Sequence, residues 1–419
     1  MVNATQGICG PLGAYRALDL TDEKGFLCGK MLADLGVDVI KVERPGGDLS
    51  RQLGPFYKNM LVPQRSLLWF AHNTSKRGIT LNITKEEGRK IFLELVRRVD
   101  FVIESFAPGY MVALGLGYED LAKVNSGIIF ASVSGFGQSG PCARWKAPDI
   151  VCMAMSGYMN LIGNPTRPPV RLTVPQAYLH AASEAAVGCL IALWHREKGG
   201  EGQQVDASAQ QAVAWDEFHN QNFWNMRKIN LRRLGGERMY GKVTYRLVFE
   251  CKDGHIIFAM FGGPIAAKRM RALVAWMAEE GMADTFLREF DWGKWSPLTF
   301  TTEAARELEK RLSPFFLTKT KRELFNAALR EGYLIAPINS IGAVAEDPHL
   351  RERGFWEEVE HPELGETLRY PGAPYKSVES PYRITKRAPL IGEHNDDIFC
   401  RELGFSDERF ADLKNRGVI

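Results

Sequence analysis

Segments typical of buried strands alternate with segments typical of helices along the first 150 residues, and this alternation constrains the fold more than any other feature. Strand-like stretches occupy residues 15–20, 37–43, 100–105 and 127–134, and helix-like stretches occupy residues 24–36 and the region after Thr84. The stretch VDVIKVE (37–43) is apolar on both faces, as expected of a parallel strand covered on both sides. Thr84 and Glu87 have the spacing of a capping box, which predicts a helix start. The alternation favours right-handed βαβ crossovers and a doubly wound α/β sheet.

A second kind of pattern follows later in the chain, which with 419 residues is too long for one ordinary core. The stretch 242–260 predicts a hairpin around Asp253 and Gly254. Helical stretches follow at 264–281, 303–313 and 321–331, and another at 406–417. We therefore predict the α/β class, with a large Rossmann-like domain built from residues 1–224 and 346–419 and a smaller α+β domain inserted at 225–345.

Composition excludes several classes of function. The net charge of +3 comes from 53 basic and 50 acidic residues, which argues against a nucleic-acid partner. Seven scattered cysteines without CxxC spacing predict reduced thiols. The sequence contains no HxxxH pair, so we do not expect a metal site on a helix. The apolar run Ala185–Trp194 is about half of the roughly 20 residues that a membrane span needs. Because no signal-peptide pattern opens the chain, we expect a cytoplasmic protein without a membrane or metal partner.

Basic residues stand at three points where strands of the predicted sheet end. Arg44, in KVERPGGDLSR (41–51), lies just beyond a strand's carboxyl end, where open α/β sheets bind ligands, and its guanidinium suits phosphate. Lys76 and Arg77 are predicted to follow another strand, and Lys146 precedes the motif APD. Together these four residues could hold a polyphosphate, although each alone is more often just a surface charge.

Two further motifs have ordinary alternatives. GFGQSG (135–140) matches the dinucleotide pattern G-x-G-x-x-G, but no amphipathic helix begins after its third glycine, so we expect neither NAD nor FAD. The segment 227–242 carries six basic residues and one acid, Glu237. It is either a solvated face, a site for anionic groups or a subunit contact.

The stretch VPQAYLHAASEAAVG (174–188) predicts a proline-led turn into a helix of small residues, a place suited to a reacting group. However, the four residues Gln176–Leu179 include no acid, cysteine or serine. His180 and Glu184 share one helix face at i and i+4. They are a local pair, a site acid with its partner, or two surface polar residues.

Several strings spread in order along the chain resemble the family III CoA-transferases, a group that includes formyl-CoA:oxalate and carnitine CoA-transferases. Among these strings are FVIESFAPGYMVALGLGYEDL (101–121), ASVSGFGQSGP (131–141), GCLIALWHREKGGEGQQVDAS (188–208) and APLIGEHNDDI (388–398). The resemblance implies a Rossmann-like domain made from both chain ends, an inserted smaller domain and interlocked ring-like dimers. It also implies that coenzyme A is bound with Arg44 and Lys146 at its phosphates, although Ala113 stands where the family often has arginine.

The resemblance also implies a chemistry that depends on one aspartate. Its carboxylate attacks the donor thioester, and the resulting mixed anhydride is opened by the CoA thiolate to an enzyme-bound thioester, from which the acceptor carboxylate takes the CoA. That aspartate lies ten or eleven residues before a helix glycine. Counting back from Gly188 reaches Tyr178 or Ala177, and neither can do this step, because tyrosine is a phenol with a pKa near 10. The racemase variant of the family needs a histidine where Pro148 stands.

Three interpretations follow. The first is a catalytically silent subunit that works in a heteromer with an aspartate-bearing homologue, as in the family's transferase from succinyl-CoA to benzylsuccinate. The second is an active homomer with a relocated acid, Glu184 or Asp149, although Glu184 lies about 9 Å along the helix from Tyr178. The third is a non-enzymatic CoA-binding or scaffold protein. We predict the first, with succinyl-CoA as a reasonable donor and a carboxylic acid as acceptor.

Overall fold

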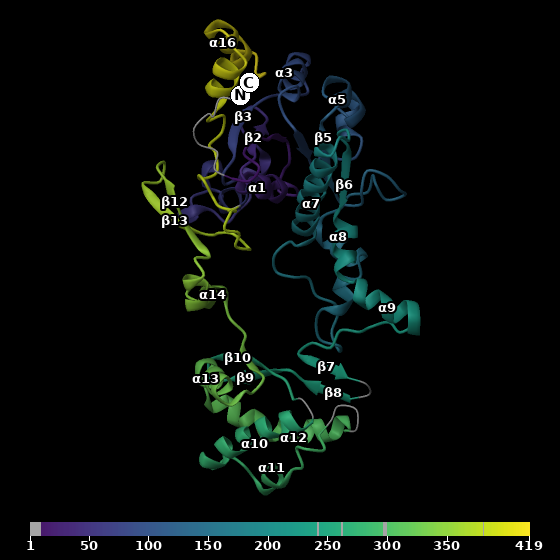
Figure 1. The fold of residues 1–419 in the computed structure, drawn as a ribbon, viewed down its shortest axis with the longest axis vertical. Helices are drawn as coiled ribbons and strands as arrows, with labels where there is room; N and C mark the ends of the chain where they lie inside the picture. Colours follow the sequence, from purple (N-terminus) through teal and green to yellow (C-terminus); the bar gives the residue numbers. More distant parts are fainter. Residues whose placement is uncertain (1–9, 241–242, 261–262, 296–299, 380) are drawn as a thin grey trace. The chain divides into compact units, whose positions relative to one another are not determined.

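The computed structural model describes residues 10–419 except 241–242, 261–262, 296–299 and 380 (Figure 1). The chain forms two compact units. Unit 1 contains the chain up to Tyr158, Arg171–Ile229 and His349–Ile419, and unit 2 contains Met159–Val170 and Asn230–Pro348. Each unit has its own secondary structure and its own buried apolar core.

Unit 1 is built on a six-stranded parallel sheet in the order β3-β2-β1-β4-β5-β6. Its strands are β1 (Arg16–Asp19), β2 (Asp38–Glu43), β3 (Arg77–Thr80), β4 (Phe101–Glu104), β5 (Ile129–Ser134) and β6 (Gln204–Ser208). Leu18 of β1 pairs in register with Ile40 of β2 and with Val102 of β4. This strand order is that of a doubly wound Rossmann fold, which confirms the predicted class.

Helices cover both faces of the sheet because its central strands are apolar on both sides. The helices of unit 1 before its C-terminal segment are α1 (Phe26–Asp34), α2 (Leu67–His72), α3 (Glu86–Val96), α4 (Tyr110–Ala113), α5 (Tyr118–Val124), α6 (Asp149–Met155), α7 (Ala177–Glu197), α8 (Ala209–Asp216) and α9 (Phe218–Arg227), with short 3₁₀ turns at Leu49–Gln52, Tyr57–Asn59 and Pro63–Arg65. A further 3₁₀ turn, Tyr158–Leu161, begins in unit 1 and ends in unit 2. The longest, α7, runs beside β5 and β6 (Figure 1). Its small buried residues, from Ala177 to Ala192, allow this close approach.

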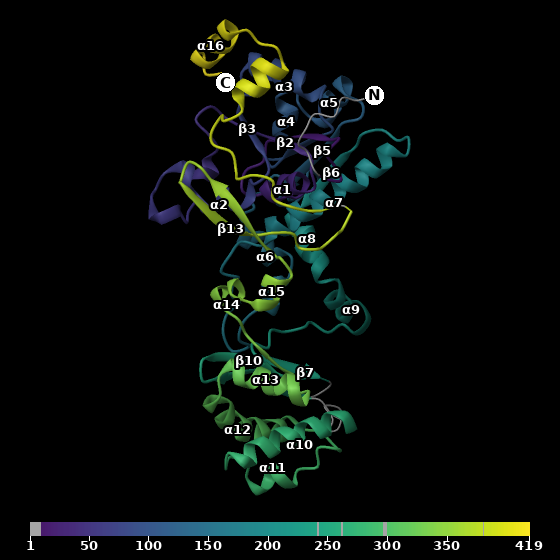
Figure 2. The same cartoon turned by 60° about the vertical axis from the view of Figure 1, so that its left-hand side comes forward.

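The C-terminal segment returns to unit 1 and completes its core. It contains α15 (Pro348–Glu352), the antiparallel pair β12 (Trp356–His361) and β13 (Glu366–Pro371), a π-helical turn (Asp396–Glu402) and α16 (Asp407–Asn415). Val359 and Tyr370 of this hairpin pack with Trp69 and Phe70 of α2 (Figure 2). Phe399 joins the main core of the sheet. The prediction that both chain ends build the large domain is therefore confirmed.

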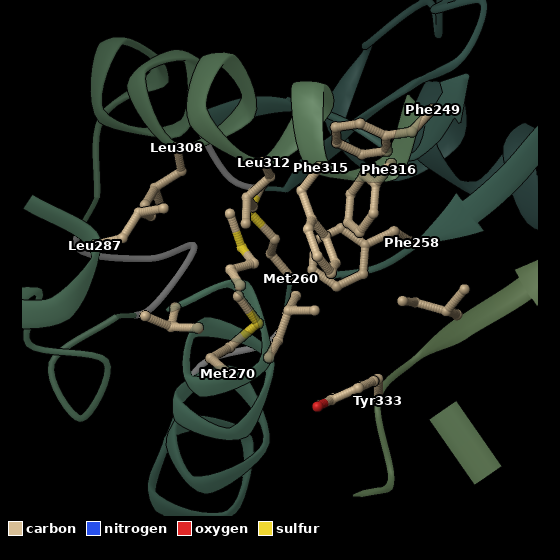
Figure 3. Close-up of a cluster of buried hydrophobic side chains, with 14 of the residues drawn as sticks. Phe249, Phe258, Met260, Met270, Leu287, Leu308, Leu312, Phe315, Phe316 and Tyr333 are labelled. Carbon is tan, nitrogen blue, oxygen red and sulfur yellow. The ribbon is translucent and has the colours of Figure 1, made fainter. Parts of the chain in front are cut away.

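Unit 2 has the predicted α+β character. It contains the hairpin β7 (Glu237–Tyr240) and β8 (Val243–Arg246), the sheet β11-β10-β9 with β9 (Val248–Cys251), β10 (Gly254–Phe258) and β11 (Ile335–Pro337), and the helices α10 (Pro264–Glu279), α11 (Thr285–Glu289), α12 (Thr302–Thr318), α13 (Lys321–Glu331) and α14 (Ile341–Ala345). Cys251 pairs with Gly254, so the hairpin predicted around Asp253 is present. Its core gathers Phe249, Phe258 and Phe316 in edge-to-face contacts (Figure 3).

Two local predictions are wrong, and one strand was not predicted. Residues 67–72 form a helix, so β3 begins at Arg77 and Lys76 precedes a strand instead of following one. The helix α3 is capped at Lys85, because the Thr84 hydroxyl donates to Asn82 at 2.6 Å and leaves no capping box. The strand β6 is absent from the predicted strands, since its edge position leaves Gln204 and Asp206 exposed and removes the apolar signal of a buried strand.

Candidate functional site

A cleft of about 590 Å³ lies at the carboxyl ends of β1, β2, β3 and β4. In this strand order the connections diverge between β1 and β4, and open α/β sheets bind ligands beside that point. The described residues around the cleft are Leu20, Asp22, Glu23, Val42, Glu43, Arg44, Asp48, Leu49, Ser50, Leu81, Asn82, Ile83, Thr84, Phe106 and Tyr110. The rings of Phe106 and Tyr110 lie 4.7 Å apart and form its aromatic wall.

Two of the four predicted basic residues are accessible at this edge of the sheet. Arg44 is exposed in the cleft, with its Nε donating to the carbonyl of Gly47 at 3.1 Å. Lys146 is exposed in the loop between β5 and α6. Since β1 and β4 lie between β2 and β5, the two loops leave strands about 14 Å apart. A single ligand that touches both residues must therefore extend along the sheet edge.

The other two predicted basic residues are used inside unit 1. The ammonium of Lys76 is fully buried and donates to Asp19, to the Phe26 carbonyl and to Asn73, all within 2.9 Å. Arg77 opens β3 and pairs with Asp38 at the amino end of β2 and with Glu402. Lys76 offers no free proton to a phosphate, and Arg77 stands at the opposite end of its strand from the cleft. We therefore no longer propose Lys76 and Arg77 as contacts to a phosphate.

A buried ion pair that the sequence reading missed supports the floor of the cleft. Arg51 is 1% exposed and donates through Nε and Nη2 to the two oxygens of Glu43, at 2.6 and 2.8 Å. Its guanidinium stacks over Trp69 and also donates to the Pro389 carbonyl. The pair fixes the end of β2 to the following turn and to the C-terminal segment. Spacing alone could not separate this role from ligand binding.

The start of α7 holds no free carboxylate at its first residues. Ala177 is buried, and its backbone N–H and that of Gln176 both donate to one oxygen of Asp149, at 2.7 and 2.9 Å. Asp149 therefore caps the helix, where unsatisfied N–H groups attract a negative charge. The carboxylate of Asp149 thus has a structural role at the start of α7.

Tyr178 is packed against the loops that follow β5. Its hydroxyl donates to the carbonyl of Ala147 at 2.5 Å and lies beside Gly135. Burial, followed by the neighbouring Cys152 thiol, raises the pKa of the Tyr178 phenol well above its ordinary value. Burial also raises the pKa of Cys152, to about 11. Neither group is a nucleophile at neutral pH, because both remain protonated.

Glu184 and His180 do not form the pair that their spacing allows. His180 Nδ1 lies 2.9 Å from the carboxylate of Asp216 at the end of α8. Glu184 is exposed, about two turns along α7 from Ala177. The carboxylate of Glu184 therefore faces solvent and lies away from the first turn of α7.

The two remaining motifs do not form a ligand site among the described residues: GFGQSG is a loop, and the segment 227–242 runs from the end of α9 into β7. After GFGQSG the next helix begins only at Asp149, so no helix N-terminus faces the third glycine. In the segment 227–242, Lys242 lies outside the described residues. Arg233 donates to the carbonyls of Asn164 and Arg167, and Glu237 pairs with Arg306. These two residues have structural roles within unit 2.

A buried acid missed by the sequence reading ends β4. Glu104 is 4% exposed and accepts from the N–H of Phe106 at 2.6 Å. Burial raises the pKa of this carboxyl to about 7, with Asp206 and Asp22 adding to the shift. Because Glu104 pairs in register with Ser132 of β5, it occupies the strand end beside the divergence point. Its apolar neighbours in the sequence gave no signal for this role.

The family model for CoA-transferase family III matches residues 16–395 of the chain. The chain belongs to this family. It is similar to the BbsE subunit of succinyl-CoA:(R)-benzylsuccinate CoA-transferase from Thauera aromatica, with 34% identity over 97% of each chain. It is also similar to succinyl-CoA:mesaconate CoA-transferase from Haloarcula marismortui, with 31% identity over 93% of the chain and 96% of that protein.

A solved structure agrees with the family III fold. A CAIB/BAIF family protein from Brucella suis superposes with a TM-score of 0.80 at 25% identity, over 94% of this chain and 99% of that one. The substrates of family III enzymes are CoA thioesters. Among the described residues, no group of three or more His, Cys, Asp or Glu is placed to hold a metal ion. By length and hydropathy one described helix, α7, could cross a membrane; 44% of its apolar window is buried in the fold.

Proposed function

We propose that this chain is the catalytically silent subunit of a CoA-transferase, working in a heteromer with a homologous chain that bears the nucleophilic aspartate. The complex moves CoA between an acyl-CoA such as succinyl-CoA and a carboxylic acid such as benzylsuccinate, in the cytoplasm. The observation that carries the proposal is the start of α7, where Ala177 and Tyr178 stand at the aspartate position and Asp149 is engaged by two backbone N–H groups.

The physical argument concerns the nucleophile. Transfer needs a desolvated carboxylate that can be acylated and then released to CoA. Tyr178 is held protonated by burial and by its bond to Ala147. Relocating the function to Asp149 would remove the cap of α7, and Glu184 is exposed to water that would hydrolyse an anhydride. The name of the BbsE relative, which is a subunit of its enzyme, supports a heteromer as well.

The exposed face of α7 supports a protein partner. Val187, Ile191 and Trp194 follow the i, i+4, i+7 spacing of one helix stripe and are 45%, 64% and 67% exposed. Large apolar side chains in a continuous stripe are typical of an interface. We keep the interlocked ring-like dimer as the proposed form of the assembly. Any CoA phosphate held by this chain is proposed to contact Arg44 and Lys146.

The test compares the chain alone with its complex. Each is purified and assayed for transfer from succinyl-CoA to benzylsuccinate and other carboxylic acids. We expect the chain alone to be inactive, the complex to be active, and Tyr178→Phe and Glu184→Gln in this chain to leave turnover within about twofold. Robust activity of the lone chain that survives Tyr178→Phe but is lost with Glu184→Gln or Asp149→Asn would establish the relocated-acid alternative. A partner that is fully active without this chain would instead favour the scaffold alternative.

A further inference from the structure

The cleft at the carboxyl edge of the sheet is lined by more carboxylates than cations. Asp22, Glu23, Glu43 and Asp48 face Arg44, which is the one basic residue among the described lining residues. When one sign of charge predominates in the walls of a cleft, the electrostatic potential inside it is strengthened and acts on any charged ligand that enters. The charges of these acids therefore determine which ligands the cleft accepts.

Two of these acids have a cation beside them. Glu43 is paired with Arg51 in the buried ion pair. Asp22 is paired with Lys24, and it also accepts from the Ser105 hydroxyl at 2.7 Å. Even with these cations included, the carboxylates outnumber the positive charges around the cleft by one.

The other two acids are held by neutral donors. Glu23 accepts from the Ser50 hydroxyl at 2.5 Å, and Asp48 accepts from the Ser50 N–H at 2.7 Å. These bonds orient the carboxylates without neutralising them, because a hydroxyl and an amide contribute no net charge. The lining of the cleft therefore carries a net negative charge.

Coenzyme A is poorly matched to this lining. Its diphosphate and 3′-phosphate together carry about four negative charges at neutral pH, since a phosphate monoester has a second pKa near 6. Like charges within a few ångströms repel strongly at the reduced dielectric of a cleft. Asp22, just after β1, bonds through its N–H and its carboxylate to the hydroxyl of Ser105, just after β4, and these two strands lie between β2 and β5. A thioester arm reaching from Arg44 to the start of α7 would therefore pass this acid.

We propose that Asp22 and Glu23 are specificity residues that exclude acyl-CoA from this chain's own cleft, so that the heteromer binds its CoA thioester on the aspartate-bearing chain alone. The inference rests on the proposed function, which supplies the second chain. It explains how a subunit without a nucleophile avoids trapping substrate that it cannot turn over. Arg44 is present, but the acids around it oppose its attraction for phosphate.

The first test titrates the full chain with coenzyme A in a calorimeter at low ionic strength. The double variant Asp22→Asn/Glu23→Gln keeps the hydrogen bonds to Ser105 and Ser50 and removes two charges. We expect it to bind at least tenfold more tightly than the wild type, with added salt narrowing the difference. Adding Arg44→Ala should abolish the gain. If the double variant does not fold, the exposed single change Glu23→Gln should still give at least a threefold gain.

The matched control is Asp407→Asn/Glu408→Gln, an exposed acid pair in the first turn of α16 with the same change in net charge. We expect its affinity for coenzyme A to stay within twofold of the wild type. A wild-type chain with micromolar affinity that the Asp22→Asn/Glu23→Gln change leaves within twofold would overturn the inference. An equal gain in the control would do the same, because the effect would then come from net charge.

The second test counts bound coenzyme A on the complex by equilibrium dialysis with labelled ligand. We expect one molecule per pair of chains for the wild type and two after Asp22→Asn/Glu23→Gln. Two molecules on the wild-type complex contradict the inference while leaving the silent-subunit proposal intact. If no complex forms, the proposed function fails, and the titration of the single chain still decides the role of Asp22 and Glu23.

Discussion

Arg51 is the residue on which the carboxyl edge of β2 depends most directly. Its guanidinium contacts Glu43, Trp69 and the Pro389 carbonyl, and it is almost fully buried. Removing one partner of a buried pair leaves the other charge without compensation, at a cost of about 3–5 kcal/mol. We expect Arg51→Ala to lower the free energy of unfolding by about that amount, measured by urea denaturation. The control Arg416→Ala, which removes an exposed pair with Asp412, should leave the free energy of unfolding nearly unchanged, because solvent screens that pair.

Glu104 makes stability depend on pH in a defined direction. Burial raises the pKa of this carboxyl from 4.5 to about 7, so between these values the folded state holds a proton that the unfolded state has released. The free energy of unfolding therefore falls as the pH rises through this window, by about 3 kcal/mol in total. We expect Glu104→Gln to be more stable than the wild type at pH 8 and similar at pH 5.

The measurement for Glu104 is thermal unfolding at both values of pH. The glutamine keeps an acceptor for the Phe106 N–H, so a loss of stability at both values would contradict the electrostatic explanation. The variant Glu87→Gln, at a half-buried position in the first turn of α3, serves as the control for general charge effects. Its pH profile should follow that of the wild type.

At the scale of elements, α7 depends on an acid from another helix for its first turn. Asp149 accepts from the N–H groups of Gln176 and Ala177, although Gln176 provides no cap of its own. We expect Asp149→Ala to destabilise the protein by about 1–2 kcal/mol, and Asp149→Asn by less, because asparagine keeps the acceptor. Denaturation curves of the two variants test this order, and equal losses would argue against capping.

The same element shows where sequence reading succeeds and where it stops. The helix itself follows from its run of small and apolar residues, and Gly188 fits it because a Cβ there would lie 2.6 Å from Val205 of β6. The contact of Asp149 with Ala177 crosses 28 positions in the sequence. No local periodicity reports such a contact, so the sequence offered Asp149 as a candidate nucleophile without revealing that it caps α7.

Strand ends give a second example at this scale. The stretch 37–43 was predicted as a strand because it is apolar throughout, and β2 occupies Asp38–Glu43. The stretch before Arg77 was misread, since LLWFAH is equally apolar but forms α2. Short apolar runs fit a strand or a helix, and here a Ser66 cap decides for the helix. The error moved Lys76 and Arg77 to the wrong end of the sheet.

At the scale of the whole molecule, each unit has its own core. Unit 2 centres on Phe316, which is fully buried and contacts the rings of Phe249 and Phe258 (Figure 3). We expect Phe316→Ala to cost about 3–5 kcal/mol in unit 2. Hydrogen exchange should increase in α10 and α12, while β1 and β4 of unit 1 keep their protection, because the units have separate cores. A uniform loss of protection in both units would contradict this independence.

The sequence by itself determined the α/β class, the inserted α+β unit and the family, because these depend on local periodicity and on strings of residues in order. It also led to the prediction that this chain lacks the family's nucleophilic aspartate, since a position in a motif can be counted. Only the tertiary structure decided which charges face solvent. Lys76 and Arg51 are buried inside unit 1, where each binds an acid. Asp22 and Glu23 lie with Arg44 in the lining of one cleft. The reason is physical: the charge that a ligand meets depends on which residues from distant loops share a surface, and each of these was an ordinary charged residue along the chain.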